Sequence, residues 1–112
     1  MSAAFAQILE DLRSEGGLQG KDIANIADVS PATVSRWTRN SATPTLSMQI
    51  VLNDLRYVVN RLAEYYTSEE ARLWLNSVHP LLNNERPIEL IRPRRTEGVL
   101  AVIERLAAAV YV

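Results

Sequence analysis

The chain has 112 residues, nearly half of them apolar, and no cysteine, so it forms one domain or one small domain with an extension, without disulfides or thiolate metal sites. Its formal net charge of −1 excludes a generally basic surface, so any binding of nucleic acid requires a local patch and a dimer. No apolar run approaches the roughly 18 residues that span a bilayer, and the amphipathic, acidic N-terminus is unlike a signal peptide, which indicates a cytoplasmic protein.

The pattern of residues 3–15 predicts a first amphipathic helix. Its apolar side chains recur at the spacing i, i+3, i+4 and i+7, which places them on one face; they are Phe5, Ile8, Leu9 and Leu12. Gly16 and Gly17 follow, and consecutive glycines end a helix.

Residues 19–40 predict two short helices joined by a tight turn. Ser30 is a good N-cap and Pro31 occupies the first helical position, where its missing N–H costs nothing. The apolar residues of both helices face one another across a common seam; they are Ile23, Ala24, Ala27, Val34 and Trp37. This arrangement is typical of a helix-turn-helix unit.

The second of these helices displays hydroxyl, amide and guanidinium groups suited to the DNA major groove. The predicted DNA-binding residues are Thr33, Ser35, Arg36, Arg39 and Asn40. Thr33, Arg36 and Arg39 are the expected base readers, and Ser35 and Asn40 the contacts to phosphate or sugar. The alternative is an ordinary pair of packed helices that never meets DNA.

A loop with Pro44 precedes the longest periodic segment, residues 46–66, which predicts a helix roughly 30 Å long. Its apolar residues alternate by four and three along the helix; they are Met48, Leu52, Leu55, Val59, Leu62 and Tyr66. Two compatible interpretations remain: a core helix that bridges two halves, and a helix that also contributes to a dimer interface.

The remaining residues predict short helical pieces and one final helix. Thr67 and Glu70 have the spacing of a capping box at the start of a short helix. Pro80 and Pro87 each begin a single helical turn, and the last helix starts near Thr96. That helix has an apolar face and ends without a polar tail.

The terminal Val110-Tyr111-Val112 is unusually apolar for a chain end, where polar residues are the norm. Either these residues pack into the protein's own core or they fill a partner's pocket. The basic cluster of Arg92, Arg94 and Arg95 has three interpretations: a solvated loop, a docking patch for an acidic partner, or a second contact to DNA phosphate.

Nothing in the sequence indicates catalysis, a metal or a cofactor, and we predict that the protein is not an enzyme. The metalloprotease, nucleophile-elbow, Walker and dinucleotide motifs are all absent. His79 is the only histidine and precedes Pro80 in an irregular stretch, which favours a turn residue or helix cap over a general base.

Residues 19–40 resemble the helix-turn-helix of Xre/Cro-type phage and plasmid repressors over about a fifth of the chain. The residues that carry this resemblance are Gln19, Ile23, Ala24, Val29, Ser30, Val34, Ser35 and Trp37. One position departs from the pattern, because Asp28 stands where such turns usually have glycine. Aspartate tolerates a left-handed backbone better than most residues, so we expect the turn to form at modest cost.

Residues 71–112 are similar to the toxin-binding domain of the Xre–RES antitoxins, the family of MbcA and ParS. The similarity rests on the order and spacing of Trp74-Leu75, Leu81-Leu82-Asn83, Pro87 to Ile91, Gly98 and Val110-Tyr111-Val112. The loop of Arg92 to Arg95 is more basic than in relatives, and Ala109 stands where many have glycine. The second departure bears on whether the tail bends away from the helix.

The resemblance implies an all-α fold with two parts, an Xre/Cro-like helix-turn-helix unit in residues 1–66 and a small toxin-binding domain in residues 67–112. It implies an antitoxin that covers the active site of a RES-domain, NAD-degrading toxin and that binds operator DNA as a homodimer within a larger complex. The expected toxin-binding residues are Arg92, Arg94, Arg95, Val110, Tyr111 and Val112. We hypothesise that Val112 brings its free carboxylate into the cationic NAD site of the toxin.

The sequence is also compatible with two other functions. The chain is a stand-alone Xre-type repressor if its C-terminal half only dimerises it, and such a repressor should tolerate loss of Tyr111 and Val112. A further alternative is a helix-turn-helix that serves as a protein-contact module and has no role on DNA.

Overall fold

The computed structural model describes residues 2–92 and 95–110, with no side chains given for residues 2–4 and 110. Within these ranges the chain is helical, as predicted, and has six α-helices and two 3₁₀ turns. The elements are α1 (Ser2–Ser14), α2 (Gly20–Ala27), α3 (Pro31–Thr38), α4 (Leu46–Leu62), α5 (Ser68–Asn76), η1 (Pro80–Leu82), η2 (Pro87–Leu90) and α6 (Thr96–Val110).

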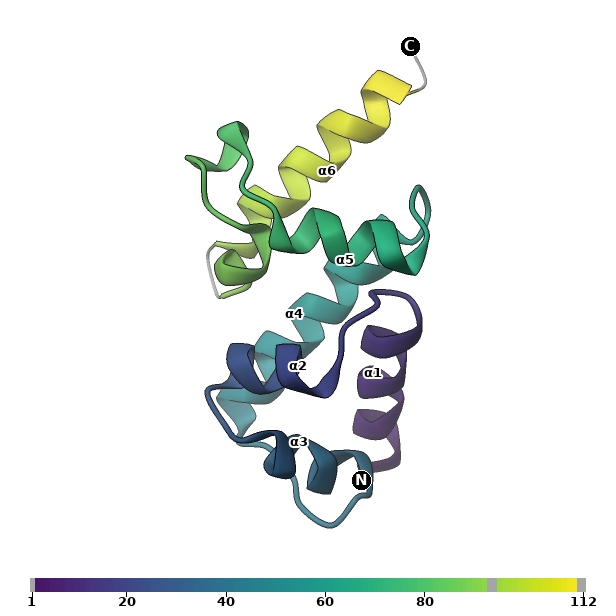
Figure 1. Ribbon diagram of the computed structural model, residues 1–112, viewed down its shortest axis with the longest axis vertical. Helices are drawn as coiled ribbons and strands as arrows, with labels where there is room; N and C mark the ends of the chain where they lie inside the picture. Colours follow the sequence, from purple (N-terminus) through teal and green to yellow (C-terminus); the bar gives the residue numbers. More distant parts are fainter. Residues whose placement is uncertain (1, 93–94, 111–112) are drawn as a thin grey trace.

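Figure 1 shows an elongated molecule, 47 Å by 24 Å by 20 Å, whose long axis separates two candidate functional regions. Helix α3 lies at one end of this axis, and the last turns of α6 lie at the other. Helix α4 runs through the middle and packs against α1 and α6 (Figure 1). No helix in the described ranges is long and apolar enough to cross a membrane.

One hydrophobic core runs through the whole molecule. The inward face of α4 is fully buried and consists of Leu52, Leu55, Val58, Val59 and Leu62. Helix α1 packs its predicted apolar face against this core, and Phe5 meets the indole of Trp37 edge-on, with ring centroids 6.1 Å apart. Because α1, α3 and α4 share these contacts, the position of α3 is fixed by the core.

The first helix ends as the two glycines predict. The Gly17 N–H donates to the Arg13 carbonyl (3.1 Å), which is the bond of an αL cap, and the Leu18 N–H donates to the Leu12 carbonyl (3.1 Å). Gly17 adopts the left-handed conformation that this cap requires, with φ at 63°.

The predicted long helix is four residues too long, because α4 ends at Leu62 and not at Tyr66. The amides of Glu64 and Tyr65 bond to carbonyls three residues back, at 3.2 and 2.9 Å, so the last turn tightens and the helix stops. The following Thr67 is extended, as an N-cap must be, and it forms the predicted capping box with Glu70. Thr67 cannot be helical and extended at once, so the capping box that starts α5 prevents α4 from continuing.

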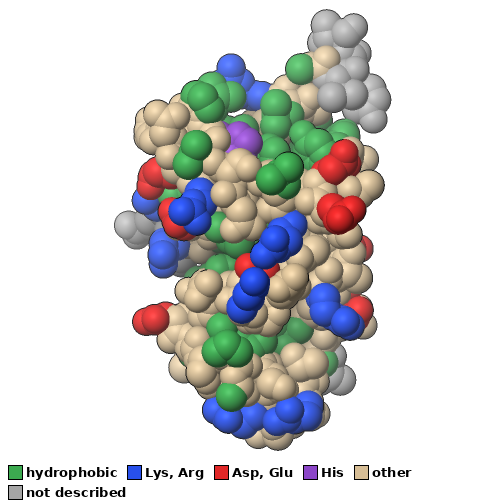
Figure 2. Space-filling model, in the orientation of Figure 1, with side chains coloured by type: hydrophobic (Ala, Val, Ile, Leu, Met, Phe, Trp, Pro, Cys, Tyr) green, Lys and Arg blue, Asp and Glu red, His purple; other side chains and the backbone are tan. Residues whose placement is uncertain are grey.

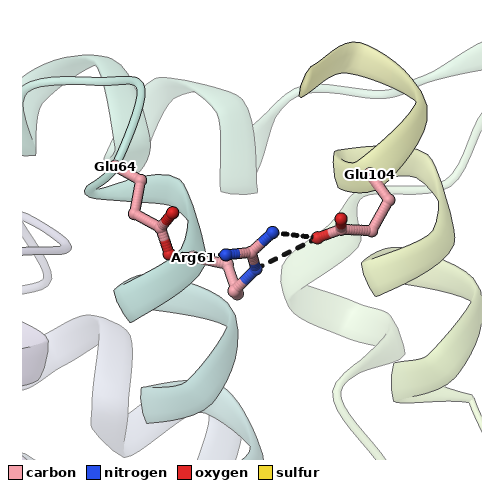
Figure 3. A network of polar contacts seen from close by, with 3 residues as sticks. All are labelled: Arg61, Glu64 and Glu104. Atoms are coloured by element: carbon pink, nitrogen blue, oxygen red, sulfur yellow. Dashed lines mark hydrogen bonds and ion pairs between the residues drawn. The ribbon is translucent and has the colours of Figure 1, made fainter. Parts of the chain in front are cut away.

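Ion pairs link elements that are distant in sequence. The Arg56 Nε donates to Asp11 on α1 at 2.8 Å. The Arg61 Nε donates to Glu104 on α6 at 3.0 Å, and its Nη1 to Glu64 at 2.6 Å (Figure 3). Hydrogen bonds to Glu104 and Glu64 raise the pKa of the Arg61 guanidinium, so this link between α4 and α6 stays charged.

Replacing Gly17 tests the contact between the two halves. Gly17→Ala is expected to lower the free energy of unfolding by at least about 1 kcal/mol, because a side chain at φ 63° costs roughly 1–2 kcal/mol. The added Cβ would also lie 2.6 Å from the Ser68 carbonyl oxygen at the start of α5. Urea unfolding measures the change. The control is Gly98→Ala, whose Cβ meets nothing within 4 Å and which should be neutral or stabilising; equal stability of the two variants would contradict the prediction.

Candidate functional site

The predicted helix-turn-helix forms with the caps that its sequence predicts. The Ser30 hydroxyl accepts a hydrogen bond from the Thr33 N–H at 3.2 Å, and Pro31 begins α3. Asp28 adopts the left-handed conformation, with φ at 57°, as expected for the residue in this turn. The Val29 N–H then donates to the Ala24 carbonyl at 3.0 Å, which closes the turn.

Val34 and Trp37 of α3 are buried, as predicted, so this helix turns one face to the core. Arg36, Arg39 and Asn40 are exposed, whereas Thr33 and Ser35 are half-buried. The Arg36 Nη2 donates to the Thr33 hydroxyl at 3.0 Å, and the Arg39 Nη1 donates to the Ser35 hydroxyl at 2.8 Å. The five predicted DNA-binding residues therefore lie together at the tip of the molecule.

The charge around α3 differs from that of the rest of the chain. Between Asp28 and Asp54 there is no acidic residue, and Arg36 and Arg39 are the only charged ones. Arg13, Arg56 and Arg61 in the same half form ion pairs with carboxylates. Arg36 and Arg39 have no carboxylate partner within the described ranges, so they form a local cationic surface on an otherwise slightly acidic protein (Figure 2, bottom).

The second predicted set of residues is divided between the two ends of α6. Arg92 and Arg95 precede this helix, and Val110 ends it, so about 20 Å separates them along a helix of 15 residues. Arg92 is exposed and lines a cavity of about 200 Å³ beside α2, while Arg95 pairs with Glu85 at 3.1 Å. Arg94, Tyr111 and Val112 lie outside the described residues. Helix α6 continues through Ala109 to Val110.

A surface that sequence reasoning missed lies at the C-terminal end of α5. Three large aliphatic side chains are exposed there, Leu73 (69% exposed), Val78 and Leu81. Figure 2 shows hydrophobic side chains gathered around the histidine on this face. The periodicity of the short segments did not reveal this patch, because exposure there depends on how the loop after α5 folds back.

His79 holds that loop against α5. Its ring lies 4.6 Å from the Trp74 indole, centroid to centroid, and its Nε2 is 3.1 Å from the Trp74 carbonyl oxygen. The His79 N–H donates to the Glu85 carbonyl at 3.2 Å, and Asn83 and Asn84 turn the chain with positive φ angles. His79 thus lies in a turn, which is one of the two roles predicted for it. Within the described ranges no cluster of side chains has the composition of a metal site.

Comparison with known proteins finds relatives over nearly the whole chain. Residues 61–111 match the family model of the antitoxin Xre/MbcA/ParS C-terminal toxin-binding domain. The mycobacterial cidal antitoxin MbcA of Mycobacterium tuberculosis is 34% identical over 96 residues, which cover 86% of this chain and 85% of the relative. A probable mycobacterial cidal antitoxin of the same organism is 27% identical over 110 residues, which cover 98% and 94% of the two chains.

A solved structure agrees with these relatives. A chain in the crystal structure of the M. tuberculosis MbcT–MbcA toxin–antitoxin complex superposes with a TM-score of 0.81 at 31% sequence identity. The match covers 96% of this chain and 97% of that chain, so both halves of the molecule and their relative placement are shared.

The left-handed Asp28 gives a test of the turn. Asp28→Gly is expected to raise the free energy of unfolding by up to about 1 kcal/mol, because glycine removes the steric cost of the left-handed backbone but loses more entropy on folding. Asp28→Ala serves as the control and should lower stability, since alanine keeps the Cβ without the local hydrogen bonding of aspartate. A urea midpoint that falls in Asp28→Gly would contradict this account.

Proposed function

The chain belongs to the Xre/MbcA/ParS family of antitoxins, and from this membership we propose that it neutralises a RES-domain, NAD-degrading toxin and represses its own operon. The C-terminal half acts on the toxin, and the helix-turn-helix acts on operator DNA as part of a homodimer. MbcA, the related antitoxin, is found in a complex with the toxin MbcT. The protein acts by binding and occlusion, without catalysis of its own.

The exposed patch of Leu73, Val78 and Leu81 carries the toxin-binding part of this proposal. It lies within the residues that match the toxin-binding family model, and large exposed aliphatic residues that gather on a surface mark contacts with other proteins. Burying side chains of this size contributes roughly 1.5–3 kcal/mol each. The patch therefore supplies binding energy, while the residues at the end of α6 enter the toxin's active site.

The end of α6 is placed for such an entry. The helix projects to the far end of the long axis (Figure 1), and Ala108 and Ala109 are exposed with side chains too small to obstruct a narrow cleft. Tyr111, which follows α6 in the sequence, then supplies the bulk that fills the cleft. The tail and the dinucleotide compete for the same position in the toxin.

The DNA part of the proposal rests on Arg36 and Arg39. Among the described residues, their guanidinium groups donate hydrogen bonds to the hydroxyls of Thr33 and Ser35 and form no ion pair. Exchanging these bonds for a guanine edge or a phosphate therefore breaks no ion pair there. Because the cationic surface of one copy is small, specific binding requires two copies on a palindromic site with half-sites about 34 Å apart.

Removing the tail tests neutralisation. Deleting Val110–Val112 should abolish protection from the toxin and leave the fold intact, because Ala107 is the last buried side chain among those that the structure describes on α6. The partner is first identified by pull-down of N-terminally tagged protein from its native cells and mass spectrometry, where a near-stoichiometric RES-domain protein is expected. Cellular NAD is then measured during co-expression of that protein with the full-length or shortened chain.

The thermal unfolding midpoint of the shortened chain is the control for folding. If the shortened chain keeps cellular NAD as high as the full-length chain does, the tail has no role in neutralisation. Recovery of only the protein itself and DNA in the pull-down would instead favour a stand-alone repressor.

Replacing Arg36 tests base reading. Arg36→Ala should weaken binding to the promoter region of its own operon by about 1–3 kcal/mol and change binding to random duplex much less. Fluorescence anisotropy at fixed salt measures both affinities. Arg105→Ala is the matched control, because Arg105 is an exposed arginine on α6 at the opposite end of the molecule. An equal loss on random DNA would reassign Arg36 to phosphate contact.

A further inference from the structure

The hydroxyl of Thr33 lies at the centre of a short chain of hydrogen bonds on α3. The Thr33 Oγ1 accepts a hydrogen bond from the Arg36 Nη2 at 3.0 Å and lies 3.1 Å from the Ser30 Oγ. Ser30 in turn caps the helix, since its Oγ accepts a hydrogen bond from the Thr33 N–H at 3.2 Å. The cap of α3 and the guanidinium of Arg36 are therefore joined through one side chain.

These contacts leave Thr33 poorly suited to identify a base by itself. Its side chain is half-buried, and of the one proton and two lone pairs of its hydroxyl, Arg36 engages one lone pair and Ser30 engages a second site. The single remaining site is too little for a bidentate contact with a base edge. An arginine has five N–H donors, and the exposed Arg36 uses one of them on Thr33. The capacity for bidentate recognition therefore resides in Arg36.

The hydrogen bond to Thr33 also sets the direction of the Arg36 side chain. Thr33 lies three residues before Arg36, one turn closer to Pro31 at the start of α3, so the guanidinium is drawn toward the first turn of the helix. In a helix-turn-helix bound to DNA, the first residues of the second helix face the base edges. Arg39 lies at the C-cap of α3 and donates to Ser35 at 2.8 Å, farther from that end. Of the two arginines, Arg36 is thus the one held at the base-facing end.

We propose that Thr33 is a positioning residue that holds Arg36 for bidentate recognition of a guanine, a role that rests on the proposed binding of operator DNA. A long side chain loses rotamer freedom when it binds, and a hydrogen bond that already orders it reduces this cost. The benefit is selective, because a guanidinium reaches a phosphate in many orientations but reaches the O6 and N7 of a guanine together in few. Loss of the Thr33 hydroxyl therefore lowers affinity for the specific site much more than affinity for random DNA.

The Thr33 hydroxyl can be removed without disturbing the helix. The cap of α3 uses the Ser30 hydroxyl and the backbone N–H of Thr33, and both stay in place when only the Thr33 side chain changes. Valine keeps the branched shape of threonine and lacks the hydroxyl, whereas serine keeps the hydroxyl. Hydrogen bonds between exposed side chains one turn apart stabilise a helix only slightly, so Thr33→Val and Thr33→Ser should both fold like the unchanged protein.

A double-mutant cycle of Thr33→Val and Arg36→Ala on the full chain tests the positioning role. Fluorescence anisotropy at fixed salt measures binding to the promoter region of its own operon and to random duplex. Thr33→Val should weaken promoter binding about fivefold, the effect of one typical hydrogen bond, and Thr33→Ser should restore it. In the Arg36→Ala background, Thr33→Val should cause no further loss, because no guanidinium is left to position.

A promoter duplex with 7-deazaguanine in place of guanine gives a base-specific measurement, because this base lacks the N7 acceptor. The unchanged protein should bind this duplex more weakly than the natural one. Thr33→Val should show a much smaller difference, since its Arg36 has already lost the bidentate contact. The matched control is Thr38→Val, because Thr38 also lies on α3 and its hydroxyl donates to the Val34 carbonyl at 3.1 Å. This control should retain the full difference between the two duplexes.

The alternative outcomes are distinct. Losses that add in the double variant overturn the positioning role, because Thr33 then contacts DNA independently of Arg36. An equal loss on promoter and random duplex also overturns it, since that is the effect of a lost phosphate contact or of misfolding. A preference for the promoter that survives in Thr33→Val overturns this inference alone. An unchanged protein that binds the promoter no better than random DNA overturns the proposed repression and this inference with it.

Discussion

The inward face of α4 holds the rest of the molecule together. Its fully buried residues, Leu52, Leu55, Val58, Val59 and Leu62, belong to one core that also includes side chains of α1, α5 and α6. At roughly 1.5–3 kcal/mol for each buried aliphatic side chain, this face outweighs any single polar contact in the structure. Because the same helix supplies core to both halves, α3 and the end of α6 are set at fixed positions along one rigid axis.

The ion pairs between helices fix how the helices are rotated against one another more than they add to the stability of the fold. Arg56 with Asp11, Arg72 with Asp22 and Arg61 with Glu104 each connect two elements, but every pair has at least one side chain that is a fifth or more exposed. Pairs of this kind contribute about 0–1 kcal/mol each. Their effect is on register, since a guanidinium that reaches one carboxylate selects one rotation of its helix over others.

Local chemistry in the sequence predicted the helices and their caps well. Ser30 and Thr67 accept the amide bonds that their positions predict, Asp28 takes the left-handed backbone, and Gly17 ends α1. The end of α4 was predicted four residues late, because periodicity continues through Tyr66 while the cap at Thr67 decides where the helix stops. Apolar periodicity favours a longer α4, whereas the hydrogen bonds of the Thr67–Glu70 capping box favour a break before α5. The pattern of apolar residues alone does not show which of the two prevails.

The candidate surfaces were predictable only in part. The α3 residues follow from the spacing of one helix, so the sequence places Thr33, Arg36 and Arg39 together. The patch of Leu73, Val78 and Leu81 depends on His79 and two left-handed asparagines folding a loop onto α5, which no periodicity encodes.

The proposed contacts with DNA and with the toxin lie toward opposite ends of the long axis, with α3 at one end and the last turns of α6 at the other. We therefore expect the two partners to use different residues of the chain. Coupling between them then arises mainly through dimerisation, because pairing two copies raises the effective concentration of the second α3 on DNA without any change of shape. A toxin that binds the far end therefore affects repression only in so far as it alters the pairing of the two copies.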